Sequence, residues 1–359
     1  MTSGGRRRAK AAAAIVTGAL LATGIALYTT DSGPFRDSYC WDGAWQQNSG
    51  PAFLGDEILD DGASERREAR SEAPTREKPR GTCVVEVRGD AERTVTVDYG
   101  PPPEDTTARK RWLFYFLHGT VTPLPDGLDG AVAEDRGLVV LPAACDTDAG
   151  PTVVTLRTTE WDGDRVSSSP GFGGPTTTRE LLLAAANAGA RAAGCAPERA
   201  LAGRAPFVSV PGDLGETMLG KELCAIPGVT FDWPRGSRYR EYRGAVGDRL
   251  QTCSLSWPLD GGEHEPSAHY VMTAAPRLNA LFAGLPEGRD QGLVRVACGD
   301  DDRDGDGGDR EAVFYGAPGV GVQGRAEPDV RGVFDAYVKA VGTRIGCGGA
   351  AAAAGGERA

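Results

Sequence analysis

The clearest hydrophobic pattern lies near the end of the chain. Apolar residues recur there at three- and four-residue steps, at Val330, Val333, Phe334, Tyr337, Val338, Val341 and Ile345. This period matches one face of an α-helix, so the segment is predicted to form an amphipathic helix. A second helix is predicted for residues 177–195, which end at Gly194 and Cys195.

Strands are predicted where apolar and polar residues alternate. Val85 and Val87 alternate with charged residues, and a second alternating run follows over residues 94–98, which is typical of an antiparallel hairpin. The fully apolar runs at 112–117 and 138–141 also have strand length, and residues 253–257 alternate again. Residues 60–80 contain almost nothing apolar, so a disordered insertion is expected there.

The order of these elements occurs twice along the chain. An apolar strand, a cysteine, a second apolar segment and a helix ending in Gly-Cys follow one another in residues 137–195 and again in residues 292–347. We therefore predict an internal duplication, with module one at 40–200, a connection at 201–222 and module two at 223–347. Each module is expected to be of the α+β class, a small antiparallel sheet with a C-terminal helix. The Gly- and Ala-rich tail at 348–359 is expected to be disordered.

The chain has eight cysteines, and the duplication assigns four of them to each module. If both modules pair their cysteines in the same way, only three patterns remain. We predict that the first pairs with the second and the third with the fourth, as Cys40–Cys83, Cys145–Cys195, Cys224–Cys253 and Cys298–Cys347. A metal or redox centre is less favoured, because the chain has no Cys-x-x-Cys motif and no histidine close to a cysteine. An even number of cysteines is typical of an oxidising compartment outside the cytoplasm.

The N-terminus has the pattern of a membrane anchor. Basic residues within positions 1–10 precede an uncharged apolar run at 11–28. As a helix this run spans about 27 Å, close to the roughly 30 Å of bilayer hydrocarbon. The basic flank places the N-terminus in the cytoplasm, residues 29–39 become a juxtamembrane linker, and the rest lies outside. A cleaved secretory signal is the alternative.

Composition narrows the classes of partner. The 359 residues are 40% hydrophobic, which is enough for two folded modules, and the formal net charge is −11. A surface of this charge repels nucleic acid and anionic lipid headgroups, so no nucleic-acid partner is expected. The membrane is expected as a partner only through the N-terminal helix.

The start of module two carries a resemblance. Leu223 and Cys224 open it, and Cys253 is followed four positions later by Trp257. This arrangement resembles the small cysteine-paired domains of exported, membrane-anchored actinobacterial envelope proteins of unknown function. Module one departs from it, since Trp41 follows its first cysteine and no Trp follows Cys83. The resemblance implies an extracytoplasmic α+β domain and carries no catalytic residues.

Two segments that contain histidine resemble parts of hydrolytic enzyme sites. Residues 114–119 read as an apolar strand ending in His118 and Gly119, which resembles the start of the oxyanion loop in α/β-hydrolases. Such an enzyme also needs a Gly-x-Ser-x-Gly nucleophile elbow, and the chain has none. His264 and His269 stand five positions apart with Pro266 between them, whereas the zinc-protease helix needs a spacing of four. We therefore place residues 264–269 in a surface loop.

An acidic loop suggests calcium. Asp300, Asp302, Asp304, Asp306 and Glu311 occupy ligand positions of the twelve-residue calcium loop, and Gly305 occupies its glycine position. The flanks, however, read as strands where an EF-hand has helices. A solvated hairpin loop therefore remains the alternative to a calcium site.

Taken as a whole, these patterns favour a membrane-anchored extracytoplasmic protein with a non-enzymatic binding or structural role at the cell envelope. No cofactor is expected. The alternatives are an α/β-hydrolase-like secreted enzyme, which rests on His118, and a calcium-responsive adhesion or sensing module, which rests on residues 300–311.

Overall fold

The computed structural model describes residues 38–41, 43–46, 66–88, 92–161, 166–168, 174–205, 216–217, 222–230, 239–258, 264–299, 310–318 and 330–347. The predicted anchor at 11–28, the N-terminus before it, the tail at 348–359 and most of the linker and of the 201–222 connection lie outside these residues. Within the described ranges, no helix is long and apolar enough to span a bilayer.

Module one is built on an eight-stranded antiparallel sheet with the order β3-β4-β5-β9-β8-β7-β6, in which β10 also pairs with β9. Its strands are β3 Arg66–Glu72, β4 Gly81–Arg88, β5 Glu92–Gly100, β6 Thr122–Pro123, β7 Gly130–Val132, β8 Arg136–Val140, β9 Val153–Trp161 and β10 Val166–Ser168. Its helices are α2 Thr106–Leu117, α3 Gly174–Ala192 and the short η3 Ala143–Cys145. A small separate pair, β1 Ser38–Tyr39 and β2 Trp45–Gln46, precedes the sheet.

Module two is built on a six-stranded antiparallel sheet with the order β11-β12-β13-β14-β16-β15. Its strands are β11 Glu216–Thr217, β12 Tyr239–Val246, β13 Leu250–Pro258, β14 His264–Thr273, β15 Leu293–Cys298 and β16 Arg310–Pro318. Its helices are α4 Pro276–Asn279, α5 Val330–Arg344 and the short turns η4 Leu223–Ala225 and η5 Ala280–Phe282. The hairpin predicted around Val85 and Val97, the strands around residues 138–141 and 253–257, and both long helices are confirmed.

The two sheets share one topology. The order β3-β4-β5-β9-β8 in the first sheet corresponds strand by strand to β12-β13-β14-β16-β15 in the second. In chain order, each module runs through three strands, a helix, the last two corresponding strands and a final helix. Helices α2 and α4 are therefore equivalent, and so are α3 and α5, which supports the predicted duplication.

Local backbone details repeat as well. The first cysteine and its successor have left-handed backbone in both modules, with φ of 60° and 39° at Cys40 and Trp41 and of 51° and 52° at Cys224 and Ala225. Both final helices end at a left-handed glycine, after which the cysteine N–H bonds back to the helix, over 2.9 Å from Cys195 to Ala190 and over 2.8 Å from Cys347 to Gly342. This is the usual glycine-based helix stop.

Four disulfides link the cysteines inside the modules. The pairs are Cys40–Cys83, Cys145–Cys195, Cys224–Cys253 and Cys298–Cys347, and the predicted pairing is confirmed. Each module has one bond near its first strands and one at the end of its last helix. Four disulfides indicate an oxidising, extracytoplasmic environment.

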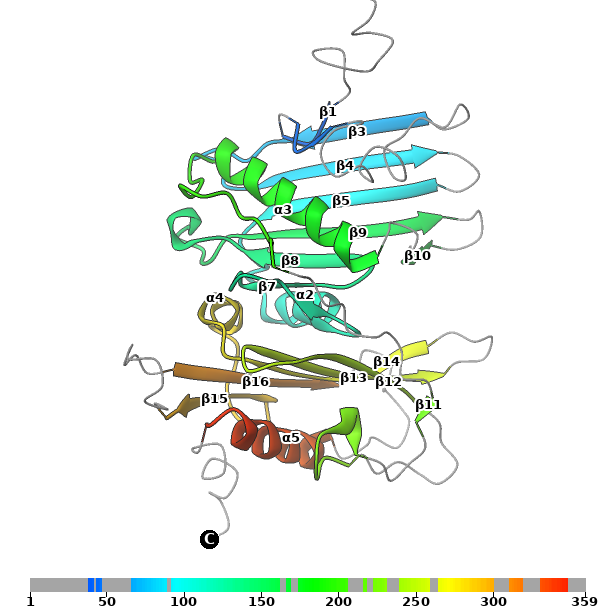
Figure 1. Cartoon of the computed structure of the whole chain (residues 1–359), viewed down its shortest axis with the longest axis vertical. Coiled ribbons are helices and arrows are strands. Elements are labelled where there is room, and N and C mark those ends of the chain that lie inside the picture. Colours follow the sequence, from blue (N-terminus) through cyan, green and yellow to red (C-terminus); the bar gives the residue numbers. More distant parts are fainter. Residues whose placement is uncertain are drawn as a thin grey trace, which may run out of the picture.

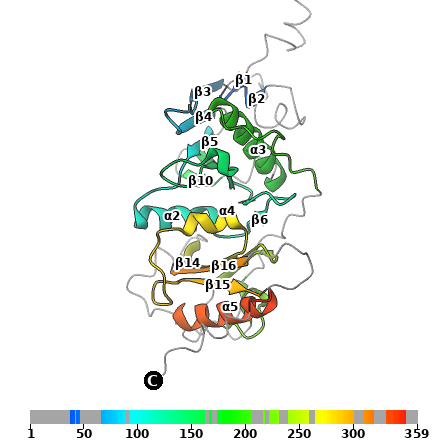
Figure 2. The same ribbon diagram turned by 90° about the vertical axis from the view of Figure 1, so that its left-hand side faces the viewer.

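The elements stack in layers, as Figures 1 and 2 show. Helix α3 covers the outer face of the first sheet, α5 covers the outer face of the second, and α2 and α4 lie together between the sheets. A hydrophobic cluster fills this middle layer and draws on both modules, with Leu113 and Phe116 from module one and Val271, Phe282 and Tyr315 from module two. The modules therefore share a core.

Three expectations about secondary structure were wrong. Residues 60–80 are not a disordered insertion where the structure describes them, because 66–72 form β3, which pairs with β4 over its whole length. Residues 68–72 of this strand are exposed, and β3 is the last strand on its side of the sheet. An edge strand needs only backbone pairing and often carries charged side chains, so its composition resembled that of a disordered segment.

Residues 112–117 form the end of helix α2 rather than a strand. The Asp105 side chain caps this helix by accepting a hydrogen bond of 2.8 Å from the Ala108 N–H. Leu113, Phe116 and Leu117 are buried in the middle layer at helical spacing. The run looks continuous because further aromatic residues fill the positions between them.

Residues 264–269 belong to strand β14 rather than to a surface loop. The strand pairs with both β13 and β16, and the pairing with β13 shifts register beside Pro266. Proline is accepted at such an irregularity because a ladder hydrogen bond is already missing there. His269 is consequently buried within the sheet.

Candidate functional site

Of the predicted calcium ligands, the structure describes Glu311. Asp300, Asp302, Asp304 and Asp306 lie outside the described residues, whereas Glu311 lies on β16. The Glu311 carboxylate pairs with the Arg295 guanidinium of the neighbouring strand at 2.7 Å. No group of three or more metal-binding side chains occurs among the described residues. Calcium binding at this loop stays a prediction.

His118 lies in the contact between the modules. It directly follows α2, and its ring is 6.0 Å from the ring of His269 on β14. The Ser254 hydroxyl on β13 lies 3.2 Å from His269 Nδ1 and accepts a hydrogen bond of 2.9 Å from the Gly119 N–H. The carbonyl of His118 in turn accepts a 2.5 Å hydrogen bond from Arg136. Polar groups of both modules thus meet in one buried cluster.

Burial determines the charge of this cluster. Burial, together with the charge of the nearby Arg136, lowers the pKa of His118 to about 3. Burial also lowers the pKa of His269 well below 6.5, with His118 and Arg136 contributing. Both rings are therefore neutral at physiological pH. Ser254 and His269 are 0% exposed, so a substrate could contact this serine–histidine pair only if the modules separated.

A groove opens elsewhere, on the outer side of module two. It has a volume of about 830 Å³ and runs between helix α5, the η4 turn and the β12–β13 hairpin. We call it the α5 groove. Its lining residues are Cys224, Ala225, Ile226, Pro227, Gly228, Arg243, Val246, Gln251, Ala336, Lys339, Ala340, Val341, Thr343 and Arg344.

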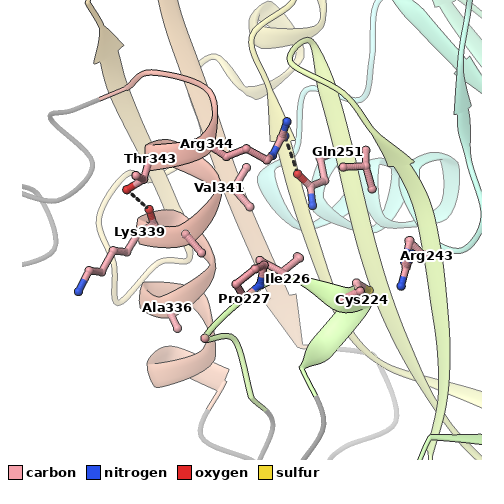
Figure 3. A pocket seen from close by; sticks show the side chains of 14 residues that line it. Cys224, Ile226, Pro227, Arg243, Gln251, Ala336, Lys339, Val341, Thr343 and Arg344 are labelled. Atoms are coloured by element: carbon pink, nitrogen blue, oxygen red, sulfur yellow. Dashed lines mark hydrogen bonds between the residues drawn. The ribbon is translucent and has the colours of Figure 1, made fainter.

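The surface of the α5 groove is mainly apolar. Ile226 and Pro227 project from the turn after η4 toward α5 (Figure 3). Val246 is 55% exposed at the groove, the highest value among the exposed large apolar side chains in the described ranges. Exposed apolar side chains that line a concavity are a common mark of a binding site.

The polar groups around the groove differ in how they are held. Arg344 reaches from α5 to the Gln251 side chain at 2.8 Å (Figure 3). It also pairs with Asp248 at 3.0 Å. Lys339 extends away from Ile226. Arg243 lies beyond Cys224 on the side away from α5, and its buried Nε has no hydrogen-bond partner among the described residues.

The equivalent position in module one is filled. Trp41, the residue after the first cysteine, is 3% exposed and donates from its indole N–H to the carbonyls of Glu72 at 3.0 Å and Thr82 at 3.3 Å. Its ring packs edge-on against Tyr99 at 6.1 Å and lies against Gly189 of α3. The indole therefore seals the space between the final helix and the first two strands of the module.

Module two has small or differently shaped residues at these positions. Ala225 follows its first cysteine in the same left-handed conformation, and Val341 stands where Gly189 stands, six residues before the last cysteine. Both residues line the α5 groove. The groove therefore lies at the position that an indole fills in the first copy. In the second copy Ala225 leaves this position open, and Val341 takes the place of Gly189.

Comparisons with known proteins add no identification. No protein-family model matches the chain, and neither the curated proteins nor the solved structures include a significant match to it.

None of the residues predicted from the sequence as chemically active lines the α5 groove, although the disulfide-bonded Cys224 does. The groove residues carry no motif, because most of them are alanine, valine or single polar groups. One sequence feature points toward the site. Aligning the two copies at their cysteines places Trp41 opposite Ala225, and such a loss of a large side chain marks a cavity.

Proposed function

We propose that this protein is a non-enzymatic, extracytoplasmic binding protein whose ligand site is the α5 groove of module two. The observation that supports this most directly is the difference between the copies: Trp41 closes the site in module one, and Ala225 leaves it open in module two. A merely structural duplication would be stabilised by a tryptophan in both copies, since a buried indole contributes a large apolar contact area.

The size and polarity of the groove favour a small apolar ligand. Its volume of about 830 Å³ falls within the range of roughly 300 to 1,000 Å³ that is typical of small-molecule sites. Such sites combine an apolar wall with a few polar groups, as Ile226, Val341 and Arg243 do here. The buried serine–histidine pair, by contrast, offers no comparable access, which favours binding over hydrolysis.

Two features support the proposed location. The four disulfides support an oxidising compartment. The basic residues within 1–10 and the apolar run at 11–28 support attachment to the cell membrane with the modules outside. We propose that the groove thereby faces the envelope space next to the membrane surface.

The substitution Ala225→Trp tests the proposed function. The left-handed φ of 39° at Trp41 shows that this backbone conformation accepts tryptophan. Because Val341 stands where Gly189 makes room for the Trp41 ring, the new indole should lie in the open groove and block it. The full chain, held in lipid nanodiscs, is irradiated with dodecanol that carries a photoreactive diazirine. We expect cross-links on peptides from η4 and α5 in the natural chain and their loss in the variant.

The control adds the same side chain away from the groove. Ala149 is exposed in a turn of module one, so Ala149→Trp should leave the cross-links in module two unchanged. Probe dissolved in the bilayer reacts equally in all samples and sets the background. Equal cross-linking of η4 and α5 in the natural chain and the Ala225→Trp variant would refute the proposed site.

A further inference from the structure

The second copy differs from the first at another position beside the groove. Arg243 on β12 is paired in the sheet with Cys253, and the equivalent residue of module one, paired with Cys83, is the exposed Ser71. The copy that lacks the tryptophan thus carries an arginine where module one carries a serine. An opening and a positive charge occur together in module two.

Among the described residues, Arg243 is the lining arginine of the groove that has no hydrogen-bond or ion-pair partner. Arg344 is held by Asp248 and Gln251, as described above. Glu241, two residues before Arg243 on β12, is buried and takes part in an interaction of its own. Within the part of the chain that the structure describes, the Arg243 side chain has no recorded hydrogen bond or ion pair.

A partly buried guanidinium without a partner is energetically unfavourable. Removing a cation from water costs free energy that only an opposing charge or hydrogen bonds recover. An anionic group placed in the groove beside Arg243 would supply both. Because one guanidinium is available, a single negative charge matches it, and the planar fork of arginine fits a carboxylate with two parallel hydrogen bonds.

The apolar wall of the groove requires the rest of the ligand to be apolar. On α5 it extends from Ala336 to Arg344, roughly 12 Å at the rise of an α-helix. Arg243 lies on the opposite side, beyond Cys224 (Figure 3). A molecule that uses both must be charged at one end and apolar along the rest of its length.

We propose that the ligand of the α5 groove is a single-chain alkyl carboxylate, whose carboxylate binds Arg243 and whose chain lies against α5. This inference rests on the proposed function, because it names the chemistry of the same site. Lys339 extends outward from the groove and adds to the positive potential at its rim.

Three diazirine probes of equal chain length test the proposal on the full chain in nanodiscs: dodecanoate, dodecanol and dodecylamine. The natural protein should cross-link dodecanoate about ten-fold more efficiently than dodecanol, because a hydrogen bond to a charged group is worth about that factor or more. Dodecylamine should give the least. Cross-links to lipid in the same sample normalise for partition into the bilayer.

Two substitutions at Arg243 separate charge from shape. Arg243→Met should reduce cross-linking of dodecanoate to the level of dodecanol and leave dodecanol unchanged. Arg243→Lys should retain part of the preference, since it keeps the charge and loses the planar fork. Circular dichroism and mobility on a non-reducing gel confirm that each variant retains its fold and disulfides.

The outcomes distinguish this inference from the function on which it rests. If Arg243→Met leaves the preference for dodecanoate intact, or the natural chain shows no preference, the carboxylate assignment is wrong and the binding groove stands. If Ala225→Trp does not reduce cross-linking of any probe, the groove itself is refuted. Ala336→Trp fills the groove from the α5 side and replaces Ala225→Trp if that variant does not fold.

Discussion

Acidification is predicted to destabilise the protein through His118. Its ring is enclosed by Phe114, Tyr242 and His269, with Arg136 and its ion-pair partner Asp135 nearby. Because burial lowers the pKa of His118 from 6.5 to about 3, the unfolded chain binds this proton more readily than the folded protein does. The contribution of His118 to stability is therefore complete above about pH 6.5 and is lost progressively as the pH falls toward about 3.

The size of the effect follows from the pKa difference. At about pH 5, an unfolded histidine with a pKa near 6.5 gains about 2 kcal/mol from protonation, whereas a folded one with a pKa near 3 gains almost nothing. The free energy of unfolding should thus fall by about 2 kcal/mol through His118 alone. His269 adds to the loss, since its pKa is lowered in the same direction.

Urea unfolding of the full chain in nanodiscs at about pH 7.5 and about pH 5, with the disulfides intact, measures this loss. In a His118→Phe variant, which keeps an aromatic ring beside Phe114 and cannot bind a proton, the pH-dependent loss should shrink by about 2 kcal/mol. An NMR titration gives an independent reading. A midpoint for His118 near 6.5, or an unchanged pH dependence in the variant, would refute the assignment of a buried neutral histidine.

Two further predictions concern the links that hold the layers together. Replacing Cys298 and Cys347 by alanine opens a loop of 49 residues and should reduce the free energy of unfolding by about 4 kcal/mol, which thermal melting with and without reductant can test. Arg277 of module two bonds to the Leu141 carbonyl at 2.6 Å and to Asp146 of module one at 2.7 Å. Arg277→Ala should cost about 2 kcal/mol in urea unfolding, whereas an unchanged midpoint would show that these contacts do not hold the modules together.

The sequence predicted those elements in which buried apolar side chains recur at a regular spacing. Helix α5 lays Val333, Phe334 and Tyr337 on the second sheet, and these residues recur at the helical period because only one face of the helix is covered. The disulfides were predictable for a related reason. A duplicated chain must satisfy the same pairing twice, which removes most of the possible connectivities.

The missed elements are those in which long-range contacts replace a local pattern. Strand β3 contains no large apolar residue, because backbone pairing with β4 holds it at the sheet edge without burial of the side chains at 68–72. The end of α2 looked like a strand because the aromatic residues Phe114 and Tyr115 stand between its buried positions, so the run shows no helical period. His269 was predicted to lie in a loop beside Pro266, yet its strand lies between β13 and β16, and Phe114 and His118 pack against its ring.

The candidate site was harder to predict from the sequence, because it depends on the lack of a tryptophan at Ala225. Ala225 carries no chemistry, and it gains meaning only when the fold shows that Trp41 fills the matching position. Arg243 is likewise one arginine among many in the sequence. Its interest comes from a location beside an apolar groove with no recorded partner among the described residues.

The middle layer bears on how the two modules came to differ at Trp41 and Ala225. Helices α2 and α4 are equivalent elements of the two copies, and they meet in one shared core. Contacts of an element with its own counterpart are those of a two-fold homodimer, so the chain is organised like a dimer whose subunits have been fused. In a true homodimer, losing a tryptophan would open both subunits at once. Fusion allows one half to stay closed and structural while the other half acquires a binding site.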